Sequence, residues 1–400
     1  MGNLGYQNYN MKIFEVNSGE LEKDFLEVHI LMNRSYPNWI RPLDQDVLSV
    51  FDPKKNKLLT KCEATRWVLK DGQGKLIGRI AAFVNKRYTN KGDDVPVGGF
   101  GFFDCIEDQK AADLLFDTAK NWLKDREMQA MDGPINLGDR DKWWGLLVDG
   151  FHPPIYNMNY NPPYYQMLFE AYGFKNFYDQ ICWSLAVAQE AHQLDPKFYE
   201  AHQKYAGNPD FRAEYLKKDK LEKYAKDLST VYNKAWAKHQ GNKDISPEQA
   251  LKLFKTIKPI LDEKLIWFVY HKDEPVAMWI NLPDINQVIK HLDGKFGWFS
   301  KLKFFLIKTF GKNENFVGLV FGVVPEFQST GLDYYMIVEA EKVIKSTTSY
   351  KKLELYWQGD FNPKMLNISK NLGGKHFRTL VTYRYLFDRN KAFERHPILP

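Results

Sequence analysis

The segment from 316 to 333 has the residue types and the order of a phosphate-binding corner. It reads FVGLVFGVVPEFQSTGLD, an apolar run that is followed by Pro325 and then by QSTG. This order predicts a strand, a short loop and a helix whose first turn has free backbone N–H groups and a positive dipole end. Gly331 lets the backbone approach a ligand closely, so we expect the ligand to be a phosphate or a diphosphate. An ordinary strand-to-helix connection has the same pattern, and the loop matches neither Walker A nor GxGxxG.

The elements around this segment occur twice in the chain, with a period of about 200 residues. GFKNF begins at Gly173 and GGKHF begins at Gly373, and an apolar, aromatic strand follows each of them. A hairpin pattern covers 66–83 and again 265–280, and each hairpin leads to an apolar strand, a helix and a further strand. The pattern predicts an α/β (α+β, mixed-sheet) protein with two tandem domains, at 11–190 and 191–391.

The sequence GVVPEFQSTG resembles motif A of the GCN5-related N-acetyltransferases, the GNAT superfamily, and each half resembles that fold in its order of elements. The whole chain resembles a bacterial group with two such domains in tandem. The resemblance implies that the pyrophosphate of acetyl-CoA or another acyl-CoA is held by backbone N–H groups of Gln328, Ser329, Thr330, Gly331, Leu332 and Asp333. It implies that the strand splays at Val323 and Val324, whose free N–H polarises the thioester carbonyl, and that Asn362 contacts the pantetheine arm.

The chain departs from the family pattern at several of these positions. Asp333 stands where the loop has a small residue in the family, and Ser369 stands where a tyrosine often serves as general acid. The strand over 316–324 has no acidic residue, so Glu354 and Asp360 are the nearest carboxylates for a catalytic base. A solvated surface carboxylate is the alternative role for both.

The first half has acidic residues at the matching corner, where it reads GFFDCIEDQKAADLLF. Glu107 and Asp108 at a helix N-terminus satisfy the dipole and repel a diphosphate, so we predict that this half does not bind coenzyme A in the usual way. The following loop, 133–165, is rich in Trp, Tyr, Asn and Pro. It is either a substrate wall, with candidates Tyr156, Asn157 and Asn159, or a packed connection between the domains.

The segment 295–312 places five lysines among aromatic and aliphatic residues. It predicts either a peripheral membrane contact or an inserted helix with its apolar side on the core. Elsewhere, no apolar run reaches the roughly 18–20 residues that span a bilayer, three scattered cysteines fit a reducing compartment, and the N-terminus lacks a signal-peptide layout. These features predict a cytoplasmic protein.

The combined features predict an acyl-CoA-dependent N-acyltransferase, in the first place an N-acetyltransferase, that acts on a small-molecule amine. No metal is expected, because the histidines lack metal-ligand spacing, and the net charge of +6 does not predict a nucleic-acid partner. One alternative is a degenerate GNAT-like binding or scaffold protein. Another is a Fem-type aminoacyl-tRNA-dependent transferase, against which the small charge and the lack of a long basic arm weigh.

Overall fold

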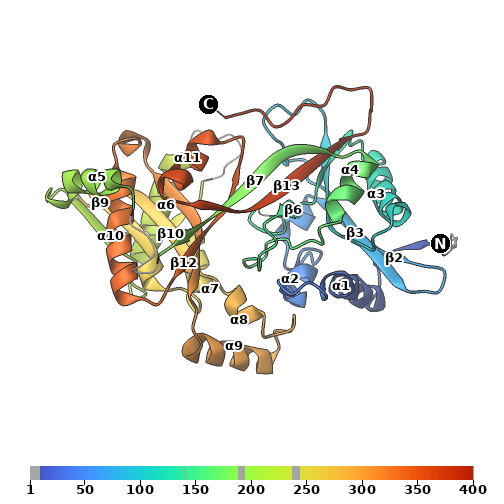
Figure 1. The fold of residues 1–400 in the computed structure, drawn as a ribbon, viewed down its shortest axis with the longest axis horizontal. Helices are drawn as coiled ribbons and strands as arrows, with labels where there is room; N and C mark the ends of the chain where they lie inside the picture. The colour runs from blue at the N-terminus through green and yellow to red at the C-terminus, as the bar shows by residue number, and fades with distance from the viewer. Residues whose placement is uncertain (1–9, 139, 188–193, 237–243, 400) are drawn as a thin grey trace, which may run out of the picture.

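The computed structural model describes residues 10–138, 140–187, 194–236 and 244–399, and within them thirteen strands form one mixed sheet. Helices cover both faces of this sheet (Figure 1). The strands are β1 (Lys12–Glu15), β2 (Glu63–Lys70), β3 (Leu76–Val84), β4 (Val97–Cys105), β5 (Ala130–Gly133), β6 (Leu146–Asp149), β7 (Lys175–Ala186), β8 (Phe211–Tyr215), β9 (Ile266–His271), β10 (Glu274–Pro283), β11 (Asn315–Val323), β12 (Lys352–Gly359) and β13 (Lys375–Leu386).

The helices lie between these strands in the repeating order that the sequence predicts. They are α1 (Gly19–Asn33), α2 (Asp44–Ser49), α3 (Gln109–Lys124), α4 (Tyr165–Tyr172), α5 (Pro196–Ala206), α6 (Leu221–Trp236), α7 (Pro247–Ile257), α8 (Asn286–Ile289), α9 (Trp298–Phe310), α10 (Leu332–Thr347) and α11 (Pro363–Asn371). Short 3-10 turns occur at Lys57–Thr60 (η1), Glu263–Leu265 (η2) and Pro325–Phe327 (η3).

The two halves exchange their last strands. The sheet order is β1-β2-β3-β4-β5-β13-β7-β12-β11-β10-β9-β8, and β6 pairs with β13. Strand β13 of the second half therefore extends the first half's sheet beside β5, and β7 of the first half extends the second half's sheet beside β12. The two long strands also pair with each other and cross the middle of the molecule in Figure 1. The predicted boundary between 190 and 191 lies within 188–193, outside the described residues.

The predicted hairpins are confirmed, since β2 pairs antiparallel with β3 and β9 with β10. Each hairpin leads to a strand that pairs in parallel with the next strand of its half, β4 with β5 and β11 with β12. A parallel pair needs a crossover, and α3 and α10 supply it. These crossovers create two equivalent strand-to-helix corners, one after β4 and one after β11.

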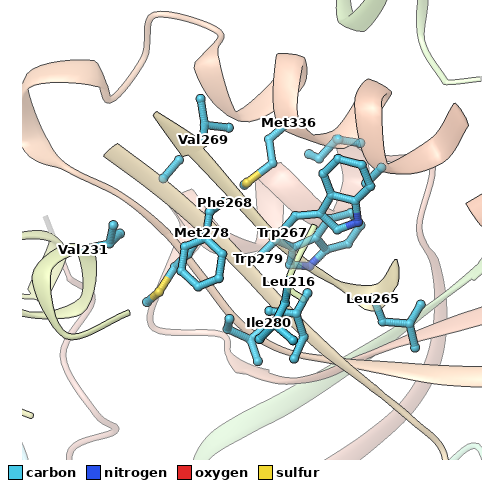
Figure 2. Packing of buried hydrophobic residues seen from close by; sticks show 14 of the residues in the cluster. Leu216, Val231, Leu265, Trp267, Phe268, Val269, Met278, Trp279, Ile280 and Met336 are labelled. Atoms are coloured by element: carbon cyan, nitrogen blue, oxygen red, sulfur yellow. The ribbon is translucent and has the colours of Figure 1, made fainter. Parts of the chain in front are cut away.

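The core of the second half forms around the apolar strands β9 and β10. The run IWFVY of β9 is buried on both faces, as expected for a strand with helices above and below it. Figure 2 shows Met336 of α10 on one side of these strands and Val231 of α6 on the other. On the inner face of α10, Leu332, Met336, Ala340 and Ile344 are buried and Val343 is half-buried. This packing fixes the position of the corner that precedes α10.

Candidate functional site

The corner between β11 and α10 presents unpaired backbone N–H groups to solvent. Tyr335 is the first residue of α10 whose N–H reaches a backbone carbonyl, that of Gly331 at 3.1 Å. Within the described residues, the N–H groups of Ser329, Thr330 and Gly331, just before the helix, make no backbone hydrogen bond, whereas Leu332 is wholly buried. Ser329 and Gly331 have φ values of 62° and 86° and flank Thr330. Left-handed residues next to a right-handed one form a backbone concavity that binds anions.

Local bonds hold the loop in this shape. Pro325 ends the strand and starts a 3-10 turn, and the Gln328 side-chain amide donates to the Val323 carbonyl at 3.0 Å. The Thr330 hydroxyl donates to the Phe327 carbonyl at 2.7 Å. Gln328, Ser329 and Thr330 are exposed, so the predicted cradle is accessible and is not filled by side chains of its own loop.

Helix α5 lies against the back of this loop, which the sequence did not predict. A Cβ placed on Gly331 would lie 2.9 Å from the Cβ of Ala201, and the Tyr205 hydroxyl donates to the Thr330 carbonyl at 3.1 Å. Gly331 is therefore required both for its positive φ and for this close approach. The only sequence feature that could have indicated this contact is the small side chain of Ala201, which lies more than a hundred residues before Gly331.

Asp333 is the one unfavourable group in the cradle. Burial raises the pKa of the Asp333 carboxyl, and the neighbouring backbone N–H groups of Asp333 and Tyr334 oppose that rise. The carboxylate therefore folds back onto the first turn of its own helix, where it competes with an external anion. The backbone N–H groups of Ser329, Thr330 and Gly331 remain for a ligand.

Strands β11 and β12 separate earlier than predicted. They pair only from Asn315 with Lys352 to Gly318 with Leu355, and beyond that point Leu319 is 41% exposed. The Val324 N–H is not free, because it donates to the Val276 carbonyl at 2.9 Å. Alternate residues of an antiparallel strand direct their N–H groups to opposite sides, so the Val323 N–H points toward the open side. Of the two predicted donors, Val323 remains the candidate.

Glu354 is buried in an ion pair. Its Oε1 lies 2.8 Å from Nη2 of Arg378, and both side chains are almost wholly buried. Burial raises the pKa of Glu354, and the Arg378 charge opposes that rise. Arg378 also donates to the carbonyl oxygens of His152 and Pro153, at 3.3 and 3.0 Å. The ion pair thus joins β12, β13 and the loop after β6. The sequence pattern did not predict this structural role.

Asp360 also has protein partners, since its carboxylate accepts the Asp179 N–H at 3.2 Å and lies 2.8 Å from Nη2 of Arg395. Asn362 is the N-cap of α11 and accepts the Met365 N–H at 3.3 Å. Ser369 is wholly buried and exchanges hydrogen bonds with the Gln358 amide. It therefore cannot take the place of the family's tyrosine. Catalytic roles for Glu354 and Asp360, and a pantetheine contact for Asn362, stay predictions.

The corner in the first half is closed by the protein itself. Asp108 is the N-cap of α3, and its carboxylate accepts the Ala111 N–H at 2.9 Å. Beyond the last paired residues of β4 and β5, the chain stays in the gap, and the Ile135 N–H donates to the Phe100 carbonyl at 2.7 Å. A Cβ on Gly101 would lie 1.9 Å from the Ile135 oxygen. Protein groups thus fill both the helix N-terminus and the strand gap of this half.

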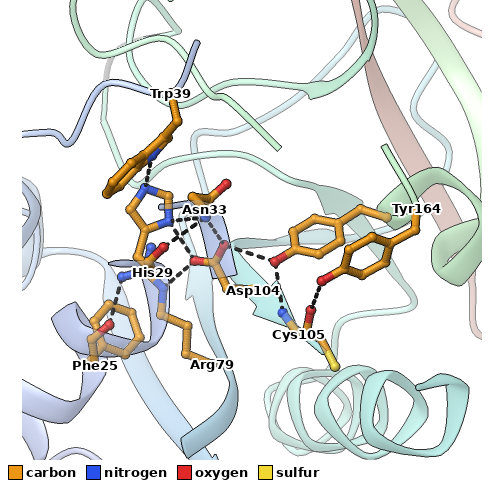
Figure 3. A network of polar contacts seen from close by, with 9 residues as sticks. Phe25, His29, Asn33, Trp39, Arg79, Asp104, Cys105 and Tyr164 are labelled. Atoms are coloured by element: carbon orange, nitrogen blue, oxygen red, sulfur yellow. Dashed lines mark hydrogen bonds and ion pairs between the residues drawn. The ribbon is translucent and has the colours of Figure 1, made fainter. Parts of the chain in front are cut away.

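A buried polar network lies on β4 of the same half (Figure 3). Asp104 accepts hydrogen bonds from Arg79 at 2.6 Å and Asn33 at 3.0 Å, and its Oδ2 lies 2.9 Å from His29 Nδ1. Burial alone would raise the pKa of Asp104, but His29 and Arg79 lower it to about 2. Burial lowers the pKa of His29, whose Nε2 accepts the Trp39 N–H at 3.3 Å. With both ring nitrogens engaged, the network serves stability.

The predicted substrate residues of the long loop all bond to the protein. The Tyr156 hydroxyl donates to Asp46 at 2.6 Å, and the Asn159 amide donates to the Gly145 carbonyl at 2.7 Å. Asn157 adopts a φ of 60° and is buried, and its carbonyl accepts the Trp143 N–H. These contacts favour the packed-connection alternative, and a substrate role for the three residues stays a prediction. Within the described residues, no group of His, Cys, Asp and Glu side chains could hold a metal ion.

Two curated proteins are similar to the chain over most of its length. A bacterial ceramide synthase of Caulobacter vibrioides (strain NA1000 / CB15N) is 26% identical over 384 residues, which cover 94% of this chain and 97% of that protein. Protein YghO of Escherichia coli (strain K12) is 25% identical over 360 residues, 87% of this chain and 88% of that protein. No protein-family model matches the chain.

Solved structures with similar folds are GNAT proteins. A tandem GNAT protein from the clavulanic acid biosynthesis pathway has a TM-score of 0.54 at 10% identity and matches 95% of this chain and all of that one. A GCN5-related glucosamine N-acetyltransferase region of a fungal multi-domain β-N-acetylglucosaminidase also scores 0.54, at 12% identity. There the match covers 94% of this chain and 38% of the larger protein. The chain thus has the tandem GNAT fold that its sequence predicts.

Proposed function

We propose that the chain is an acyl-CoA-dependent N-acyltransferase whose second half binds the coenzyme A portion. The observation that carries the proposal is the accessible loop at 328–331, where left-handed Ser329 and Gly331 flank Thr330 directly before the N-terminus of α10. Such a corner fits a diphosphate by charge and by geometry.

Bound acyl-CoA would supply a thioester to the gap between β11 and β12. An amine nitrogen attacks the thioester carbon, the C–N bond forms, the C–S bond breaks, and the proton that the nitrogen loses passes through solvent to the departing thiolate, which leaves as the free thiol. The Val323 N–H, on the open side of β11, is the group of this chain that can donate to the developing oxyanion. Because Glu354 and Asp360 are engaged in ion pairs, we expect the amine to arrive deprotonated, with positioning as the main catalytic effect.

The ceramide synthase likeness sharpens the substrate class. Ceramide is the amide of a fatty acid and a long-chain amino alcohol, and we extend this class of acceptor and acyl group to the present chain. Exposed Leu319 at the start of the gap provides an apolar surface for such groups. A fatty acyl donor thus replaces acetyl as the preferred expectation.

The test is turnover by the full chain, measured as free thiol and as amide product. Palmitoyl-CoA and acetyl-CoA are compared with sphinganine as the acceptor, and the same amino alcohol with its amine already acetylated is the control. We expect thiol release only with the free amine, and faster release from palmitoyl-CoA. Binding of either donor without turnover would instead support the scaffold alternative, which Asp333 and buried Ser369 favour.

A further inference from the structure

Helix α9, inserted between β10 and β11, has an unusual surface for a folded protein. None of its residues is buried. Six of its eight large apolar side chains are exposed by 45% to 82%, namely Trp298, Phe299, Leu302, Phe305, Leu306 and Phe310, and the other two, Phe304 and Ile307, are partly buried. The rest of the described chain has six more exposed large apolar side chains, but these are scattered over other elements. Such a concentration marks a surface that contacts something apolar.

The six residues form one face, called here the α9 apolar face. Trp298, Leu302 and Phe305 follow one another at helical spacings, and Phe299, Leu306 and Phe310 lie beside them. The opposite side attaches the helix to the protein, because Phe304 packs on Phe296 with ring centroids 5.9 Å apart. In Figure 1, α9 lies at the lower margin of the molecule, outside the sheet. Among the described residues, none covers the apolar face.

The charge around this face is of one sign. Five exposed lysines lie in and beside the helix, and the stretch from 294 to 313 has no acidic residue; the lysines are Lys295, Lys301, Lys303, Lys308 and Lys312. Lys303 and Lys308 donate to the backbone carbonyls of His291 and Pro259, which keeps these cations beside the helix. The whole chain has a net charge of only +6, so the excess cation charge is concentrated here.

We propose that the α9 apolar face docks on an anionic lipid bilayer, with its aromatic side chains at the headgroup–acyl boundary and the lysines at the phosphates. Trp, Phe and Leu on one face with Lys beside them are the composition of an interfacial helix. A second copy of the chain fits less well, because symmetric pairing of this face would oppose two sets of five lysines. Within the described residues no helix has the length and apolar content to span a bilayer, so the contact is with the surface.

Vesicle co-sedimentation of the full chain, without acyl-CoA or amine, tests this inference independently of the proposed function. We expect at least tenfold tighter binding to phosphatidylcholine vesicles with 30% phosphatidylglycerol than to pure phosphatidylcholine, and weaker binding at high salt. The variant Phe299→Glu with Phe305→Glu should lose at least tenfold in affinity. Leu253→Glu, at a 46% exposed site on α7, is the matched control and should bind like the parent.

Thermal melting shows whether each variant keeps the parent fold, since all three substituted side chains are exposed. Equal binding by the parent and the double variant, or no binding to either vesicle, would overturn the proposal. Sedimentation velocity without lipid gives a further outcome. Self-association that the double variant abolishes would assign the α9 apolar face to a second copy of the chain and would also overturn it.

Discussion

The two strand-to-helix corners occupy the same place in the two halves and differ in what fills them. After β4, the Asp108 carboxylate caps α3, and after β11 the N-cap is left-handed Gly331, which has no side chain to cap α10. The first corner satisfies its helix dipole internally, and the second leaves donors for an anion. The two copies of the fold therefore differ in what meets the N-terminus of the crossover helix, a capping carboxylate in one and a glycine in the other.

The strand gaps repeat this contrast. In the first half Ile135 lies against Gly101, so backbone fills the space between the strands. In the second half the matching stretch of β11 carries exposed Leu319 and partly exposed Val320. The gap of the first half is thus filled by its own backbone, and the last strand of this half, β7, completes the sheet beside β12.

The most disruptive test of this contrast is Gly101→Ala. The added methyl would lie 1.9 Å from the Ile135 carbonyl oxygen, which is backbone and cannot rotate away. We expect a loss of roughly 3–5 kcal/mol in the free energy of unfolding, measured with urea. Leu319→Ala in the open gap should cost less than about 1 kcal/mol. Equal losses for the two variants would mean that the first gap is not filled as described.

A second variant, Glu354→Gln, tests whether the buried carboxylate belongs to the site or to the scaffold. It leaves the buried Arg378 charge without its partner, so the free energy of unfolding should fall by about 3 kcal/mol. Urea unfolding and turnover are measured on the same preparation. Lost turnover at unchanged stability would restore Glu354 as a catalytic base.

The third test compares Ser329→Asp with Ser329→Asn, two variants that differ only in charge. It asks whether the corner after β11 binds an anion. Both residues tolerate the left-handed backbone and have nearly the same shape. The aspartate should weaken acyl-CoA binding at least tenfold, about 1.4 kcal/mol, because it adds a negative charge beside the diphosphate. Titration calorimetry should find the asparagine variant within about threefold of the parent. Similar affinities for both variants would remove the diphosphate from this corner.

The smallest effect is expected for Asp108→Ala in the closed corner. Loss of the N-cap should lower the free energy of unfolding by about 1 kcal/mol, because the Ala111 N–H loses its partner. Acyl-CoA affinity should not change. A second binding site in this variant, seen as doubled stoichiometry in calorimetry, would show that Asp108 alone closes the first corner.

Local patterns in the sequence were sufficient for most of the fold. The hairpins and the order of strand, helix and strand at both corners follow from apolar runs, turn residues and helical spacing, which short segments contain. The exchange of β7 and β13 did not follow, because DQICWSLAV and LVTYRYLF have similar apolar character and would fit beside either neighbour. Strand partners depend on tertiary geometry that composition does not encode.

The site was predictable to the same extent. The strand, loop and helix around 328–332 could be predicted because their signal lies within a short segment, and the binding role of this corner stays a prediction. Three features were missed because each depends on residues that are distant in the sequence. They are the ion pair of Glu354 with Arg378, the hydrogen bond from the Val324 N–H to β10, and the packing of α5 against the loop. Contacts with residues distant in the sequence determine whether a side chain or a backbone N–H group is available for catalysis.

A crystal structure of the full chain with coenzyme A tests the central claim most directly. The account predicts that the diphosphate accepts hydrogen bonds from the backbone N–H groups between Ser329 and Leu332, with the pantetheine arm in the gap between β11 and β12. Coenzyme A density at the corner after β4, or away from both corners, would contradict it.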